Sequence, residues 1–162
     1  MKTKYYSGSF DAPWSPSLMW ISWGATAMFV GFSIFLISVQ KPGVWFPSVA
    51  MNCIWLLTAL FTVRGYRLQD QTLYVQRLIW ETRIDLRDLE KAYQEPEAFR
   101  RCFKTFGNGG LFSFSGYFRS KKLGTFRCWV TDTKKSVVLE VKGKKLVISP
   151  DSPESFLLAV SC

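Results

Sequence analysis

The side chains that most often carry out chemistry are sparse in this chain. The 162-residue sequence contains no histidine and four cysteines. Without histidine, Ser-His-Asp and Cys-His nucleophilic sites, histidine-ligated zinc and a histidine general base are excluded. The cysteines lie far apart, with no CxxC spacing: Cys53, Cys102, Cys128 and Cys162. Because Cys53 sits in an apolar run, we expect neither a four-cysteine zinc site nor a disulfide framework, but reduced thiols that pack among apolar neighbours.

Carboxylates offer one further candidate for catalysis. Asp85, Asp88 and Glu90 form the tightest acidic group of the chain. In an ideal strand Asp85 and Asp88 lie on opposite faces, because successive side chains alternate. Exposed charges are therefore a better interpretation than a metal site or an acid–base pair. No cysteine has an evident base partner, so the sequence predicts a protein that is not an enzyme and that has no cofactor.

A glycine-rich stretch, Gly107–Gly110, has a composition that can cradle a phosphate. Three of its four residues are glycine, but no Gly-Lys-Ser/Thr follows, so it is not a Walker loop. We expect a turn or bulge that only glycine fits, followed by aromatic side chains that pack on a sheet or on the membrane surface. Residues 103–118 contain six aromatics: Phe103, Phe106, Phe112, Phe114, Tyr117 and Phe118.

Basic side chains are in excess, giving the chain a net charge of +9, and six of them flank the glycine-rich stretch. These six are our candidate surface for an anionic lipid or an acidic partner: Arg100, Arg101, Lys104, Arg119, Lys121 and Lys122. Each Lys or Arg near an anionic membrane surface contributes about 1 kcal/mol to association. The alternative is a solvated charged surface that only satisfies the positive-inside rule. Nucleic acid is a disfavoured partner, because acidic residues interrupt the charge and the chain is predicted to be tethered to a membrane.

Two long uncharged segments precede this basic part. Residues 18–39 and 44–63 contain 22 and 20 residues without a charged side chain. As helices they are about 33 and 30 Å long, enough to cross a hydrocarbon core of about 30 Å. Residues 40–43 include Pro42 and Gly43 and break the helix, so the sequence predicts a transmembrane hairpin.

Two alternatives to the hairpin remain open. The first segment can be a cleaved signal peptide, although it is longer than a signal core and no small-residue cleavage site follows it. Both segments can be a buried pair of soluble helices, although they are hydrophobic all round and almost free of charge.

The flanking charges predict the orientation of the hairpin. Lys2 and Lys4 precede the first segment, whereas Lys41 alone lies in the turn. Arg64 and Arg67 follow the second segment. Since positive residues stay on the cytoplasmic side, we expect a multi-pass protein of the inner membrane with both termini in the cytoplasm.

The polar side chains inside the two segments predict packing rather than transport. None of them is ionisable, so two such spans do not make a transporter by themselves. Asn52 is expected to hydrogen-bond across a helix–helix contact. Ala27 and Gly31 form a small-xxx-small pair, which can mark the face where helices approach closely.

From Tyr66 onward the hydrophobic period changes to two, which is typical of half-buried strands. Residues 72–77 and 83–87 alternate in this way. Short, turn-punctuated runs follow at 125–131 and 137–141, and Leu146 and Ile148 continue the pattern after a turn at 142–144. These runs predict an antiparallel meander.

The end of the chain has the pattern of a helix. Asp151 is a candidate cap and Pro153 fits the first turn. Phe156, Leu157 and Val160 then form an apolar stripe at helical spacing. The sequence thus predicts an α+β cytoplasmic domain, a bent antiparallel β-sheet or barrel capped by one C-terminal helix. The predicted organisation is an N-terminal cytoplasmic segment (1–17), a first span (18–39), an external turn (40–43), a second span (44–63) and the cytoplasmic domain (64–162).

Several short segments, taken in order, carry a resemblance to a known family. They are Leu73-Tyr74-Val75, residues 82–89, the glycine-rich stretch with Gly116-Tyr117-Phe118, residues 123–126, residues 130–132 and the ending at 147–156. The ending, with Ile-Ser-Pro-Asp-x-Pro-Glu-x-Phe, is the most specific of them. Over residues 66–162 the chain resembles the membrane-anchored bacterial pleckstrin-homology-like (PH-like) domain proteins, of which a transmembrane hairpin is a common companion.

The resemblance implies a seven-stranded, strongly bent sheet capped by one C-terminal helix, and it implies no catalytic activity. Around the first predicted turn, Arg67, Asp70 and Arg77 make a poor phosphoinositide cage. We therefore predict a membrane-anchored, non-enzymatic binding or scaffold module that presents its domain at the inner face of the membrane. Its partner is expected to be a protein, a second copy of the chain or an anionic lipid. The alternative is a small accessory subunit of a larger integral membrane complex.

Overall fold

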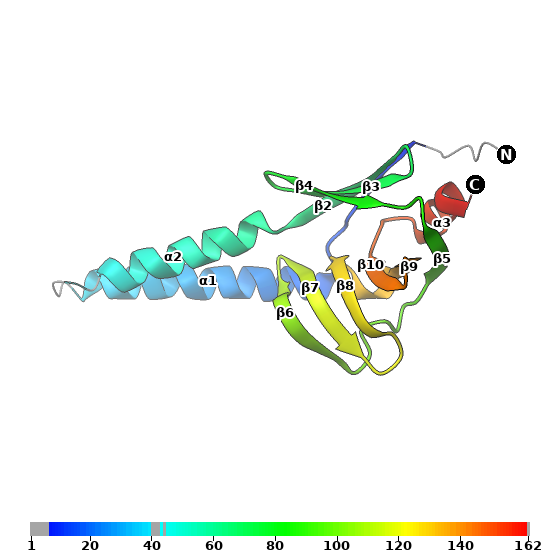
Figure 1. The fold of residues 1–162 in the computed structure, drawn as a ribbon. Helices are drawn as coiled ribbons and strands as arrows, with labels where there is room; N and C mark the ends of the chain where they lie inside the picture. Colours follow the sequence, from blue (N-terminus) through cyan, green and yellow to red (C-terminus); the bar gives the residue numbers. More distant parts are fainter. Residues whose placement is uncertain (1–6, 40–42, 44, 162) are drawn as a thin grey trace.

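The computed structural model describes residues 7–39, 43 and 45–161, which fold into a helical part and a sheet part (Figure 1). The helical part consists of α1 (Pro16–Ser38) and α2 (Trp45–Leu60), which project together from the sheets. The Ser15 hydroxyl caps α1 by accepting a hydrogen bond from the Leu18 amide at 3.3 Å. The predicted turn at 40–43 and the flanking Lys2 and Lys4 lie, except for Gly43, outside the described residues.

The two helices differ in length from the predicted spans. Among the described residues, Pro16–Ser38 is the helix that is long and apolar enough to cross a membrane. The second helix has 16 residues and a length of about 24 Å, less than the hydrocarbon core of about 30 Å. It ends before residue 63 because Val63 already belongs to the first sheet, where its side chain is fully buried.

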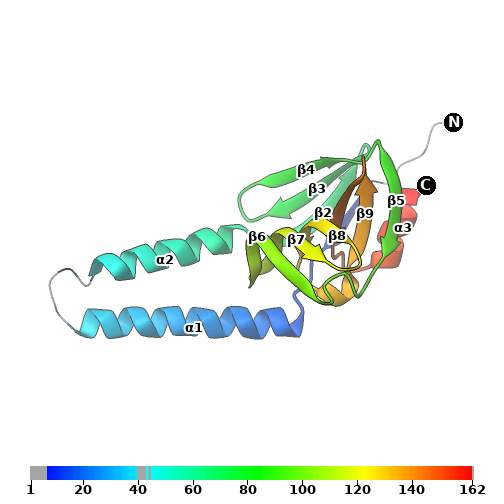
Figure 2. The same ribbon diagram turned by 60° about the horizontal axis from the view of Figure 1, so that its bottom comes forward.

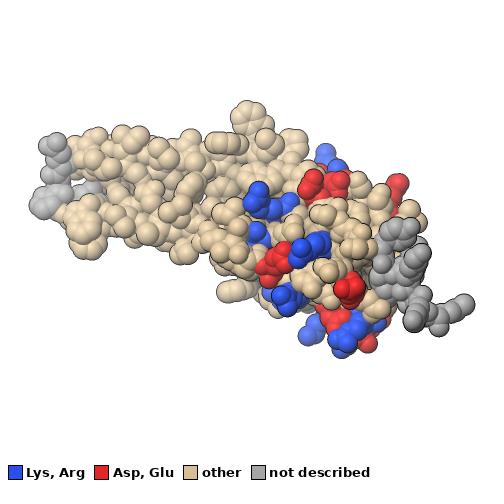
Figure 3. Space-filling model, turned by 90° about the horizontal axis from the view of Figure 1, so that it is seen from above, with Lys and Arg blue, Asp and Glu red and all other residues tan. Residues whose placement is uncertain are grey.

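The surfaces of the helices argue against a buried soluble pair. Leu18 and Ser22 of α1 and Ser48 of α2 are buried, but large apolar side chains such as Trp20 and Ile54 are exposed. Figure 3 shows the charged side chains gathered on the sheet part and none on the visible side of the helical part. An apolar surface of this extent is typical of helices that contact lipid or other helices.

The first sheet is made of strands that flank the helical part in the sequence. Its strands are β1 (Gly8–Asp11), β2 (Val63–Gln69), β3 (Thr72–Arg77) and β4 (Glu81–Asp85), in the order β1-β2-β3-β4 with antiparallel pairing. Gly8 pairs with Leu68, and Asp11 pairs with Gly65. The helical hairpin is therefore an excursion between two neighbouring strands. Residues 8–11 belong to the sheet, although the sequence predicts residues 1–17 only as a separate segment.

The second sheet contains the remaining strands. In spatial order they are β5 (Leu89–Gln94), β9 (Val137–Val141), β10 (Lys144–Ile148), β8 (Gly124–Val130), β7 (Ser113–Ser120) and β6 (Cys102–Leu111). A short 3-10 helix, η1 (Thr133–Lys135), follows β8. The predicted meander is wrong for the last three strands, because β10 lies between β9 and β8 and runs parallel to β8.

The C-terminal helix α3 (Pro153–Ser161) closes one end of the two sheets, as the sequence predicts (Figures 1 and 2). Phe156 and Val160 are buried, and the Phe156 ring packs edge-on against Phe10 of β1 with centroids 5.2 Å apart. The helix begins after Ser152, whose carbonyl accepts from the Phe156 amide. Asp151 is not seen to cap it: its carboxylate accepts a hydrogen bond from the Ser152 hydroxyl at 3.2 Å.

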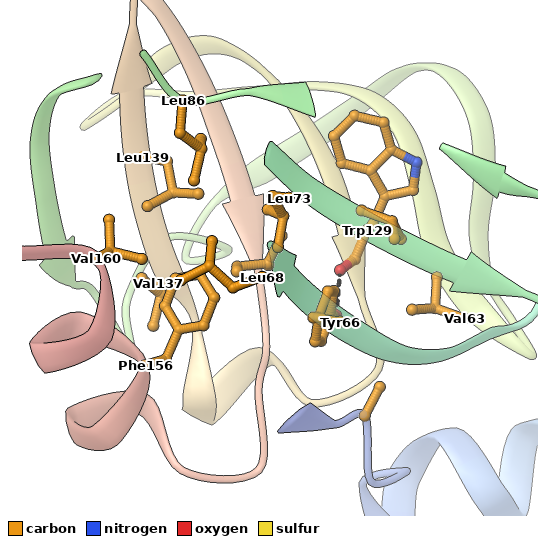
Figure 4. Close-up of a cluster of buried hydrophobic side chains, with 13 residues drawn as sticks. Val63, Tyr66, Leu68, Leu73, Leu86, Trp129, Val137, Leu139, Phe156 and Val160 are labelled. Carbon is orange, nitrogen blue, oxygen red and sulfur yellow. Dashed lines mark hydrogen bonds between the residues drawn. The ribbon is translucent and has the colours of Figure 1, made fainter. Parts of the chain in front are cut away.

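The main core lies between the two sheets and α3, and Figure 4 shows its side chains. A second buried cluster, which includes Phe118, Phe126 and Val147, covers the opposite face of the second sheet. The fully buried Tyr66 joins the sheets through its hydroxyl, which donates to Trp129 O at 2.6 Å and accepts from Ser149 N at 3.1 Å.

The tip of the β6–β7 hairpin contacts both helices. The amide of Phe112 donates to the Ser22 hydroxyl of α1 at 3.0 Å. Its ring lies 6.1 Å from that of Trp14 and 5.8 Å from that of Trp55 in α2. These contacts pack the sheet part against the helices, so the two parts are joined by side-chain and backbone contacts as well as by the chain itself.

Candidate functional site

The basic residues selected from the sequence do not form one surface. Arg100 and Arg101 precede β6, and Lys121 and Lys122 follow β7. Since Cys102 pairs with Ser120, these four residues and Arg119 come together at one end of the β6–β7 ribbon. The helices contact the opposite end, and the eight residues of β7 separate the two ends by about 26 Å.

Two of the residues at this basic end already have acidic partners. Lys122 Nζ lies 2.6 Å from a Glu95 carboxylate oxygen, and Arg100 lies 3.0 Å from Glu97. Lys104 is different, because it sits farther along β6 and its side chain lies beside Gly109. It contributes to a separate site that is nearer the helices.

This site is a pocket of about 540 Å³ where the two sheets diverge beside the end of α2. Its walls come from α2 and the residue after it, from the end of β3 and from strands β6, β7 and β8. The lining residues are Thr58, Phe61, Arg77, Lys104, Phe106, Gly107, Asn108, Ser115, Gly116, Tyr117, Arg127 and Trp129. The walls thus combine aromatic rings with cations, and among the described residues no carboxylate lines the pocket.

Two facing glycines shape one wall of the pocket. Gly107 of β6 pairs with Gly116 of β7, and their φ angles are +117° and +142°. A Cβ on Gly107 would meet Ser115 O at 2.3 Å, and one on Gly116 would meet Phe106 O at 2.2 Å. Only glycine permits this close approach of the two strands. The glycine-rich stretch is therefore an irregular strand, with a φ that requires glycine, rather than a phosphate-binding loop.

Arg77 is the central cation of the pocket. It is half-buried on the inner face of β3, and its guanidinium lies 5.3 Å from the centroid of Phe61 and 5.6 Å from that of Trp80. Its Nε is buried without a hydrogen-bond partner in the described part of the chain. Burial and the like charge of Arg127 both lower the pKa of Arg77. An anion bound here would accept a hydrogen bond from the buried Arg77 Nε and would offset the repulsion between the two guanidinium charges.

Arg127 supplies the second cation from the other sheet. Its guanidinium lies 4.6 Å from the Trp129 ring centroid and 5.6 Å from that of Tyr117. Neither Arg77, Arg127 nor Lys104 takes part in an ion pair within the described residues. The pocket thus has three cations over an aromatic floor, which suits a ligand with an anionic group and an apolar body.

Comparison with protein families decides the kind of domain that carries this pocket. A model described as a bacterial PH domain matches residues 64–161. The chain belongs to the bacterial PH domain family. The match starts within β2, so β1, which comes before the helical part in the chain, lies outside it. Comparisons with curated proteins and with solved structures gave no match.

The sequence predicted the PH-like fold and the C-terminal helix, but not the two arginines of the pocket. Arg77 follows Leu73 and Val75 on the inward face of β3, and Arg127 is exposed but alternates on the same face of β8 as the buried Trp129. For Arg77, an arginine at an inward position of an alternating strand is the signal that identifies the site. The pocket itself depends on strands that are fifty residues apart in the chain.

The three acidic residues Asp85, Asp88 and Glu90 each contact a neighbouring group of the PH domain. Hydrogen bonds from Arg87 hold the pKa of Asp85 at about 2. Asp88 pairs with Lys142 at 3.0 Å. The Glu90 carboxylate accepts from the Gly143 amide at 3.1 Å. In the described part of the chain no group of three or more His, Cys, Asp or Glu residues could hold a metal ion.

The cysteines of the described chain, Cys53, Cys102 and Cys128, are free, and Cys162 lies outside the described residues. Cys128 is buried, and burial raises the pKa of its thiol well above the ordinary value. Its Sγ lies 3.5 Å from Phe114 O, as expected of a packing thiol.

Of the residues predicted to pack between the helices, Asn52 lies in the contact between α1 and α2, whereas Ala27 and Gly31 do not. Asn52 Nδ2 donates to the Ser33 hydroxyl of α1 at 2.8 Å and to Ser48 O of its own helix at 2.7 Å. Ala27 and Gly31 are exposed, and a Cβ on Gly31 would meet no atom within 4 Å. The small-xxx-small face is therefore not the contact between α1 and α2.

Proposed function

We propose that this protein is a membrane-anchored, non-catalytic binding module whose PH domain holds the headgroup of an anionic phospholipid. The observation that carries the proposal is the pocket with Arg77, Lys104 and Arg127 around an aromatic floor. Guanidinium groups bind phosphate oxygens in pairs, and such charge-assisted hydrogen bonds are about twice as strong as neutral ones. Family membership supports a binding module in general, and the pocket supplies the chemistry of the ligand.

The pocket also suits a lipid because of its neighbours. Thr58 of α2 and Phe61, which directly follows that helix, line it, so an acyl chain could continue along α2 while the headgroup contacts the cations. The PH domain and its flanks, residues 64–162, carry 18 Lys and Arg against 11 Asp and Glu. Such a surface is attracted to the anionic inner leaflet.

We also propose that α1 and α2 both cross the inner membrane, with both termini in the cytoplasm. The pairing of β1 with β2 supports this topology, because the strands before and after the helices must lie on the same side of the membrane. If α1 crosses, α2 must bring the chain back. The short α2 can be accommodated by local thinning of the bilayer, by snorkelling of flanking side chains or by oligomerisation.

The test is retention of lipid by the full-length protein. We would purify the protein in a mild detergent, add phosphatidylglycerol or phosphatidylcholine, and count bound lipids by native mass spectrometry. The double variant Arg77→Gln, Arg127→Gln should lose phosphatidylglycerol by about tenfold or more, since each charged hydrogen bond contributes about 1.5–3 kcal/mol. The matched control, Arg119→Gln with Lys121→Gln, removes equal charge at the distant basic end and should bind as the wild type does.

Three results would count against the proposal. Equal retention of both lipids would remove the preference for an anion. Loss only in the control variant would move the site to the basic end selected from the sequence. A soluble acidic protein that copurifies and depends on Arg77 would make the pocket a protein-binding site.

A second candidate function is an accessory subunit of a larger membrane complex or a homo-oligomer. The exposed face with Ala27 and Gly31 favours it, because small residues let a partner helix approach closely. Substitution of both by leucine should then release a stoichiometric membrane partner on purification, or shift the protein from oligomer to monomer. Unchanged composition after this substitution would argue against the subunit role.

A further inference from the structure

The turn between β3 and β4 has an unusual composition for an exposed hairpin. Its residues Leu78, Ile79 and Trp80, which we call the β3–β4 tip, are 49%, 70% and 38% exposed. The Arg77 amide donates to Trp80 O at 3.0 Å and closes the turn. Hairpin turns in water favour Gly, Asn, Asp, Pro and Ser. Three large apolar residues in this position indicate that something other than water covers them.

Contacts place the tip beside the C-terminal end of α2. The Trp80 ring packs edge-on against Phe61, with centroids 5.1 Å apart. Leu78 lines a groove together with Ala59 and Thr62 from the end of α2 and the residues after it. Figures 1 and 2 show the β3–β4 hairpin reaching toward the helical part from the sheet. The exposed apolar surface of the helices thus continues onto the tip.

The length of α2 locates this region relative to a bilayer. Its 16 residues span about 24 Å, whereas hydrocarbon core and headgroup regions together span about 40–45 Å. A bilayer centred on α2 would extend past both ends of the helix, and beyond Leu60 it would reach Phe61 and the tip. The exposed Arg64 lines the same groove as Leu78, and Arg77 lies over the Trp80 ring. Aromatic side chains beside arginines are typical of the membrane–water interface.

We propose that the β3–β4 tip inserts into the inner leaflet as a third membrane contact, which fixes the orientation of the PH domain on the bilayer. The occupant of this surface is lipid rather than a protein, because the tip is continuous with the apolar surface of the helices at the same depth. The inference rests on the proposed membrane anchoring but not on anion binding in the pocket.

The test measures the depth of a spin label in the full-length protein reconstituted in phosphatidylglycerol–phosphatidylcholine nanodiscs. The label is attached at Ile79→Cys in a background with the four native cysteines replaced, and its collision with oxygen and with a water-soluble nickel chelate is compared. The aqueous control is Asp70→Cys, at the exposed turn on the other end of β3. The lipid control is Met28→Cys, at a 63% exposed position within α1.

We expect the Ile79 label to collide mainly with oxygen, as the Met28 label does, and the Asp70 label to collide mainly with nickel. An Ile79 label as accessible to nickel as the Asp70 label would overturn the inference. A label shielded from both reagents would also overturn it, because a protein partner would then cover the tip. Nickel access at Met28 would instead refute the membrane anchoring itself, so the two failures are distinguishable.

Discussion

Replacement of Tyr66 by phenylalanine tests whether the two sheets are held together by one buried hydroxyl. In the native fold this oxygen donates to Trp129 O at 2.6 Å and accepts from Ser149 N at 3.1 Å. Both partners are backbone groups in residues at most 1% exposed, so neither turns toward water. Leaving a buried polar group without its partner costs about 1–3 kcal/mol, and here two groups are affected. We expect Tyr66→Phe to lower the free energy of unfolding by about 3 kcal/mol.

The same residue predicts a pH dependence. Burial raises the pKa of Tyr66 far above its ordinary value of about 10. Above pH 10 the unfolded chain loses the phenolic proton while the folded protein keeps it, so the stability contributed by Tyr66 is complete below pH 10 and falls above it. The loss is about 1.4 kcal/mol per pH unit. Because Tyr66→Phe has no such proton, the difference between wild type and variant should shrink above pH 10.

The assay is a urea titration of the full-length protein in detergent micelles, followed by near-ultraviolet circular dichroism at pH 7 and at several values above pH 10. Tyr74→Phe is the matched control, because Tyr74 is half-buried on the outer face of β3 and its hydroxyl has no hydrogen bond to a described residue. Equal stability of Tyr66→Phe and Tyr74→Phe would refute the proposed role of the hydroxyl. A difference from wild type that widens above pH 10 would refute the proton linkage.

Two further predictions concern the β6–β7 ribbon. Gly116→Ala should destabilise the sheet by about 3 kcal/mol or more, because the added Cβ would lie 2.2 Å from Phe106 O. The control is Gly124→Ala, whose Cβ would meet no atom within 4 Å and which should cost clearly less in the same urea titration. Phe112→Ala should cost about 3–5 kcal/mol and increase hydrogen exchange at the ribbon tip measured by mass spectrometry, since the ring packs on Trp14, just before α1, and on Trp55 of α2. Unchanged exchange would show that the tip is held by its backbone alone.

The sequence predicted those features that depend on local periodicity. The uncharged run up to Ser38 predicted α1, and the apolar stripe with Phe156 and Val160 predicted α3. Alternation predicted β3, whose Leu73 and Val75 face the main core, and β8, whose Phe126, Cys128 and Val130 face the second buried cluster. These signals are contained within single segments, and their physical basis is the burial of one face.

Features that depend on distant pairing could not be predicted in this way. Four residues, Gly8–Asp11, are too few for a periodic signal, and their partner strand begins more than fifty residues later. The insertion of β10 beside β8 depends on the packing of whole strands, not on turn residues. The pocket combines Arg77 and Arg127, whose neighbourhood exists only once the two sheets have formed.

The pairing of β1 with β2 has a consequence for synthesis of the protein. Residues 12–62 separate the two strands, so β1 leaves the ribosome first and stays unpaired until β2 has been synthesised. At about 5–20 residues per second this interval lasts on the order of several seconds. With α1 and α2 inserted as proposed, the translocation machinery must return the chain to the starting side before the sheet can close. With this topology, pairing of β1 with β2 requires that both helices have inserted correctly. A chain with one helix left uninserted would keep two unpaired strand edges exposed to aggregation.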